Sequence, residues 1–152
     1  MHRHNPWKSI LIALAAFVCS ALPLAAQQKN GIILTIRVTG ARNANGTVRV
    51  LLFRGPDGFP ADGTRVFQAQ TVKIETDGNT AQCIFSVPRG EYAAAVFHDE
   101  NGNGKMDKNL VGVPKEGYGF SNDPGRKMRP AKFEEARFRA ESNQSVDVKL
   151  AY

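Results

Sequence analysis

Apolar and polar residues alternate along several short stretches of the chain, and this period of two is typical of β-strands with one buried face. The clearest case is residues 80–87, where Cys83, Phe85 and Val87 share one predicted face. Residues 91–98 are largely small and apolar, as in a strand covered on both faces. Further strands are expected at residues 31–38, 47–53, 70–75, 136–141 and 146–152. About seven strands with almost no helix predict an all-β fold, an antiparallel β-sandwich of the immunoglobulin-like kind.

The connections between these strands are marked by glycine, asparagine and proline. Residues 43–46 predict a turn that joins the first two strands into a hairpin, and Asp77-Gly78 predicts a second hairpin. In the loop at residues 55–63, Phe59 is expected to anchor the chain onto the sandwich. Residues 133–136 predict a helical turn. Residues 99–132 show no period, and a connection this long is usually functional or ordered by a metal.

The first 26 residues have the anatomy of a cleavable export signal. Arg3 and Lys8 form a basic start, an apolar run follows at residues 10–18, and Pro23 precedes small residues. The alternative is an uncleaved membrane anchor, but the run is shorter than the roughly 20 residues that a bilayer span requires. We therefore expect a single domain at residues 27–152 without a transmembrane segment, exported to the periplasm or secreted.

Charge and cysteine content narrow the function classes. The chain has 20 basic and 14 acidic residues. Removing Arg3 and Lys8 with the signal leaves 18 against 14, a net charge of +4. This excess is dispersed along the chain, which argues against nucleic acid as a partner. Cys83 would be the one cysteine left, so no disulfide can form within the exported chain, and we expect its thiol to be buried and unreactive.

Short oxygen-bearing side chains recur after the strand at residues 91–98. Asp99, Asn101 and Asn103 occupy the first, third and fifth positions of a loop in which Gly104 allows a sharp turn. Lys105 could supply a backbone carbonyl, and Asp107 stands at the ninth position. This spacing is typical of loops that bind calcium through oxygen ligands. The sequence therefore predicts a calcium-type site formed by Asp99, Asn101, Asn103, Lys105 and Asp107.

The pattern departs from an EF-hand at the twelfth position, where Leu110 replaces the bidentate glutamate. We therefore expect weak calcium binding, with a dissociation constant of about 10⁻⁴–10⁻³ M. The alternative is a tight turn with solvated aspartates and no metal. Glu116 could fold back to complete the shell of the cation, and no other cofactor is indicated.

Two further features could form a ligand site. His98 is either a hydrogen-bonded residue at the end of a strand or a general base beside the loop. Tyr118 and Phe120, which alternate with glycines, either form a binding lip or plug the mouth of the sandwich. His98, Glu116, Tyr118 and Phe120 are thus candidate ligand-binding residues. No catalytic constellation of nucleophile, acid and base is present in the sequence, and Ser121 has no neighbouring acid–base pair.

Two long motifs carry a resemblance to a known family. They are His98-Asp99-x-Asn101-Gly102-Asn103-Gly104-Lys105-x-Asp107 and the run from Gly112 to Asn122, Gly-Val-Pro-Lys-Glu-Gly-Tyr-Gly-Phe-Ser-Asn. The chain resembles the bacterial exported proteins classed as domain of unknown function 2141. The resemblance implies an exported β-sandwich of the transthyretin or carboxypeptidase-regulatory type and assigns no activity.

Two functions from different classes follow from these features. The first is a non-enzymatic periplasmic or envelope-associated module, stabilised by calcium, that binds an unknown protein or small ligand near Tyr118 and Phe120. The second is a metal-assisted hydrolase that uses His98 or Glu116 beside the Asp99 loop. A buried His98 that faces the core would count against the hydrolase.

Overall fold

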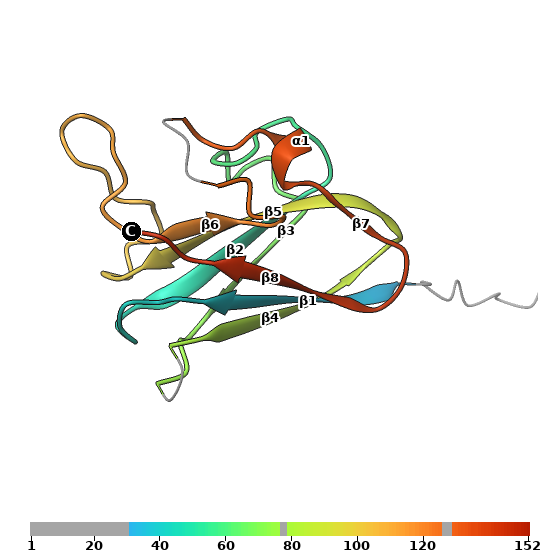
Figure 1. The fold of residues 1–152 in the computed structure, drawn as a ribbon, viewed down its shortest axis with the longest axis horizontal. Helices are drawn as coiled ribbons and strands as arrows, with labels where there is room; N and C mark the ends of the chain where they lie inside the picture. Colours follow the sequence, from blue (N-terminus) through green and yellow to red (C-terminus); the bar gives the residue numbers. More distant parts are fainter. Residues whose placement is uncertain (1–30, 77–78, 126–128) are drawn as a thin grey trace, which may run out of the picture.

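The computed structural model describes residues 31–76, 79–125 and 129–152, and their backbone is largely β-strand (Figure 1). The described strands are β1 (Ile32–Thr39), β2 (Thr47–Phe53), β3 (Gln68–Val72), β4 (Ala81–Val87), β5 (Gly90–Asp99), β6 (Tyr118–Phe120), β7 (Phe138–Ala140) and β8 (Gln144–Lys149). One helical turn, α1 (Phe133–Ala136), precedes β7. The predicted all-β sandwich is confirmed. The expected signal at residues 1–26 and the Asp77-Gly78 turn lie outside the described residues.

Two sheets form the sandwich. One has the order β4-β1-β8, and the other has the order β3-β2-β5-β6, with β7 also paired to β5. The strands β1 and β2 therefore lie in different sheets, and the predicted hairpin between them is wrong. Instead, β1 pairs with β4 and β8, and residues 40–46 cross from one sheet to the other. The β1–β8 pair is parallel, whereas the other described strand pairs are antiparallel.

The main core lies between the two sheets and follows the predicted alternation. Every second residue of β1 from Ile32 to Val38 is buried, and so is every second residue of β4 from Ala81 to Val87. Cys83 is 1% exposed, as expected. Its burial raises the pKa of the thiol to about 11, so almost none of it is the reactive thiolate near neutral pH.

A second apolar cluster covers the outer face of the five-stranded sheet. Phe133 and Ala136 of α1 pack there against Phe53 of β2 and against β5. The ring of Phe59 lies 5.3 Å from that of Phe53 and 5.9 Å from that of Phe133, measured between centroids. Phe59 therefore anchors its loop as predicted. Because apolar groups cover both faces of β5, its small side chains are buried on both sides.

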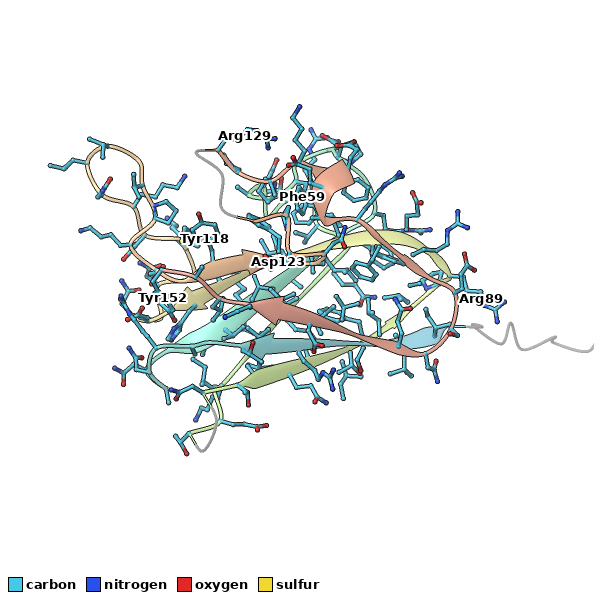
Figure 2. All side chains as sticks on the ribbon, in the orientation of Figure 1. Phe59, Arg89, Tyr118, Asp123, Arg129 and Tyr152 are labelled. Carbon is cyan, nitrogen blue, oxygen red and sulfur yellow. The ribbon has the colours of Figure 1, made fainter. Side chains whose placement is uncertain are left out.

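One end of the sandwich collects the residues with candidate chemistry. The C-terminal end of β5, the turn at residues 43–46 and the chain end near Tyr152 meet there, and a long loop projects from this end (Figure 1, Figure 2). β6 lies within the stretch predicted to lack a period. A bridge between Tyr118 and Ala151 links β6 to the chain that leaves β8. Within the described ranges, no helix has the length and apolarity that crossing a bilayer demands.

Candidate functional site

The loop that follows β5 begins at a buried carboxylate. Asp99 is 3% exposed, and its two oxygens accept hydrogen bonds from the backbone N–H groups of Asn103 (3.0 Å) and Gly104 (2.7 Å). The carbonyl of Gly104 accepts a further bond from Arg49 on β2, at 2.9 Å. Charged hydrogen bonds of this kind offset the cost of removing a carboxylate from water. Asp99 therefore fixes the first turn of the loop against the sandwich.

The predicted cation ligands are brought together by direct hydrogen bonds. The side-chain amides of Asn101 and Asn103 donate to the two carboxylate oxygens of Asp107, at 2.7 and 2.9 Å. The amide oxygens of Asn101 and Asn103 accept from the N–H groups of Asn103 and Lys105, at 3.1 and 2.8 Å. Each of these oxygens thus already has a hydrogen-bond partner.

The loop offers oxygen atoms of the kind that bind a cation, but these oxygens already accept hydrogen bonds that a cation would have to replace. Two carboxylates and two amide oxygens suit calcium. A cation at Asp107 would displace the amide donors of Asn101 and Asn103, whose N and O atoms would have to exchange places. In the described part of the chain, no group of three or more histidine, cysteine or acidic side chains is placed to hold a metal. Binding of a cation at Asp107 would therefore require the amides of Asn101 and Asn103 to rearrange.

Glu116 closes the loop at its other end. It is 4% exposed, and its oxygens accept from the N–H groups of Glu100 and Asp107, both at 2.9 Å. The side chain folds back onto the Asp99 loop, where the sequence had suggested a cation ligand. One carboxylate thus ties together two backbone segments seven residues apart. We call Asp99 and Glu116 the anchor carboxylates of the loop at residues 99–117.

His98 is fully buried beneath this loop. Its Nε2 atom lies 2.6 Å from the carbonyl oxygen of Asn45, and its Nδ1 atom lies 2.6 Å from the hydroxyl of Tyr152. A carbonyl can only accept, so Nε2 carries the hydrogen, and in the neutral ring Nδ1 accepts from Tyr152. Both ring nitrogens of His98 therefore already have hydrogen-bond partners within the protein. The structure thus corresponds to the expected hydrogen-bonded residue at a strand end.

The partners of His98 were not identified from the sequence. The hydroxyl of Tyr152 accepts from the backbone N–H of Arg42 at 3.0 Å, and the Arg42 guanidinium lies 4.6 Å from the centre of the Tyr152 ring. Burial raises the pKa of Tyr152 above its usual range. Arg42 also pairs with Glu100 at 2.7 Å. The alternation that ends at Tyr152 predicted only a strand at residues 146–152.

Glu100 stays ionised in this cluster. Burial by itself would raise the pKa of its carboxyl group, but hydrogen bonds from Arg42 and Asn43 outweigh burial and hold the pKa below its usual range. The Arg42–Glu100 pair therefore joins the crossing segment at residues 40–46 to the first residue after β5.

Tyr118 and Phe120 face different surroundings on β6. Phe120 packs against Phe59 in the second apolar cluster, with 5.9 Å between ring centroids. Phe120 therefore packs on the outer face of the five-stranded sheet rather than at the mouth of the sandwich. Tyr118 is half-buried and lines a small pocket with Asp123, Arg129 and Lys149. Figure 2 shows Tyr118 and Asp123 near the β6 edge.

The far end of the loop presents apolar side chains to solvent. Leu110, Val111 and Val113 are 107%, 82% and 53% exposed. The carboxamide oxygen of Asn109 accepts from the N–H groups of Val111 (3.0 Å) and Val113 (2.9 Å), and the Asn109 N–H donates to the carbonyl of Val113 at 2.8 Å. We call residues 109–113 the tip. From the sequence, Leu110 was notable only as the residue that replaces a calcium-ligating glutamate, and no local pattern indicated the exposed tip.

Comparison with known proteins places most of the chain in a bacterial family. A family model described as "Uncharacterized protein conserved in bacteria (DUF2141)" matches residues 36–149, which include the whole loop and both anchor carboxylates. No curated protein and no solved structure matches the chain.

Proposed function

We propose that this chain, which belongs to the bacterial DUF2141 family, is an exported, non-enzymatic binding module of the periplasm or cell exterior. Its binding function would reside in the loop at residues 99–117. The observation that carries the proposal is a contrast within the loop. Two buried carboxylates hold its base, whereas its tip presents three exposed aliphatic side chains. Large apolar groups exposed together commonly mark a surface that binds something. Export is inferred from the pattern of residues 1–26.

The contacts of the candidate catalytic groups support binding over chemistry. Both nitrogens of His98 and both oxygens of Glu116 are already hydrogen-bonded inside the fold. The hydroxyl of Ser121 is buried and donates to the carbonyl of Ala136 at 2.6 Å. A general base must be able to reach a proton on the substrate. His98 and Glu116 are therefore not placed to act as the base of a metal-assisted hydrolase, and we favour the binding module.

We propose further that residues 99–107 form a weak calcium site. Support comes from the meeting of Asp99, Asn101, Asn103 and Asp107 in one turn and from the hard oxygen donors that they offer. Weak binding is expected because the cation must replace hydrogen bonds that already exist. Lys105 would contribute its backbone carbonyl.

Calcium at 1 mM is expected to raise the melting temperature by about 3–8 °C relative to chelator. With a dissociation constant of ~10⁻⁴ M, binding to the folded state alone stabilises it by about 1.4 kcal/mol, which gives a shift of that size in a domain of this length. The measurement is a thermal melt followed by circular dichroism.

Two variants show whether the loop is responsible. Asp107→Ala should abolish the calcium-dependent shift. Asp147→Ala removes an exposed aspartate that pairs with Arg37 on the three-stranded sheet, and it should keep the shift. Superimposable melting curves of the unmutated protein in calcium and in chelator would refute the calcium site.

A further inference from the structure

The tip combines exposed aliphatic side chains with a basic flank. Lys108 and Lys115 border it on either side, because an antiparallel bridge joins Lys108 to Pro114, and both lysines are exposed. Lys105 is also exposed, one turn closer to the base of the loop. Among the described residues, none of these three lysines forms an ion pair. The positive charge at the tip is therefore available to an external partner.

The acidic residues nearest to these lysines are already engaged in the fold. Glu116 is buried and accepts two backbone bonds, and the carboxylate of Asp107 accepts the amides of Asn101 and Asn103. The outer segment at residues 108–115 contains Leu110, Val111 and Val113 together with Lys108 and Lys115 and no acidic residue, so its own formal charge is +2. This is the composition that interfacial membrane segments share.

The shape of the tip also restricts the class of partner. It projects away from both sheets (Figure 1), and it is a convex turn held by its own hydrogen bonds to Asn109. A projecting turn of this kind can enter the headgroup region of a bilayer, and the backbone N–H groups of Val111, Gly112 and Val113 are already hydrogen-bonded within the turn. Because the anchor carboxylates hold its base, the tip need not become ordered when it inserts.

We propose that the tip docks the protein on an anionic lipid surface, with Leu110 and Val111 inserted at the headgroup boundary and Lys108 and Lys115 against lipid phosphates. The proposal rests on the function proposed above for the loop and names its partner. Each lysine near an anionic surface should strengthen binding about fivefold. Removal of the aliphatic groups should weaken binding at least about tenfold.

A tryptophan placed at the tip tests this proposal directly. The chain has one tryptophan, Trp7, which lies in the expected signal. In the exported protein, the tryptophan introduced by Leu110→Trp would be the only one. Its fluorescence emission is expected to shift to shorter wavelength when vesicles of phosphatidylglycerol and phosphatidylcholine are added. Ile84→Trp is the matched control, because Ile84 is 52% exposed but lies on β4 of the other sheet. Its emission should not change.

Sedimentation with the same vesicles tests the contributions of charge and apolar contact separately. Leu110→Ser/Val111→Ser should reduce binding at least about tenfold, and Lys108→Gln/Lys115→Gln should reduce it about 25-fold on anionic vesicles.

Unchanged Leu110→Trp emission on anionic vesicles would overturn the inference, as would equal binding to purely neutral vesicles. A Leu110→Trp shift that depends on protein concentration without vesicles would overturn it in favour of self-association. Calcium-dependent melting without vesicle binding would refute the lipid partner alone and leave the proposed calcium-binding module in place.

Discussion

Replacing Glu116 by glutamine is expected to lower the free energy of unfolding by about 2–3 kcal/mol. The carboxylate accepts backbone N–H bonds from both Glu100 and Asp107, whereas a glutamine side chain offers one oxygen and one NH₂ group. One of the two backbone N–H groups would then face a donor and lose its bond. The loss is measured by urea unfolding, where the midpoint multiplied by the slope of free energy against denaturant gives the free energy of unfolding.

Glu134→Gln provides the control for this change. Glu134 is exposed in the first turn of α1 and is far from the loop in sequence, so its substitution should alter stability by less than about 0.5 kcal/mol. If Glu116→Gln is as mild as Glu134→Gln, Glu116 does not anchor the loop.

Gly46→Ala is expected to lower the free energy of unfolding by more than about 3 kcal/mol. A Cβ atom at this position would lie 2.0 Å from the backbone oxygen of Asp99 and 2.8 Å from the backbone of Glu100. These are backbone atoms, which cannot move away as a flexible side chain can. The residue also has φ of 67°, which is unfavourable for alanine. Thermal and urea unfolding of the purified variant measure the loss.

Gly102→Ala separates the two causes. Gly102 has a similar φ of 72°, but a Cβ atom there meets nothing within 4 Å. The Gly102→Ala substitution should lower the free energy of unfolding only by the strain of the left-handed conformation, about 1–2 kcal/mol. Equal losses for Gly46→Ala and Gly102→Ala would mean that the crossing turn does not pack tightly against the start of the loop.

The strands could be predicted from the sequence because burial of one face leaves a local signal. In β1 and β4 the alternation of apolar residues coincides with the buried positions. The choice of partners could not be predicted in the same way. β1 pairs with β8, with Leu34 opposite Gln144, and no local pattern records a contact over such a separation. The turn residues at 43–46 are equally suited to a hairpin and to a crossing between sheets, which is why the predicted hairpin was wrong.

The candidate site could be predicted in part for a related reason. The spacing of Asp99, Asn101, Asn103 and Asp107 indicates a turn in which they meet, and they do meet. The same oxygens can accept from amides or bind a cation, and sequence spacing does not distinguish these alternatives. Arg42 and Tyr152 come from opposite ends of the domain, so their contact had no local signal.

Backbone hydrogen exchange in the presence of chelator tests most directly whether the anchor carboxylates hold the loop. The amides of Glu100, Gly104 and Asp107 donate to Glu116 and Asp99, whereas the amide of Leu110 at the tip has no acceptor among the described residues. We predict that the first three exchange at least about 100-fold more slowly than Leu110, and that Glu116→Gln removes much of the protection of Glu100 and Asp107. Exchange of all four amides at the same fast rate, or protection that appears only after calcium is added, would contradict the account.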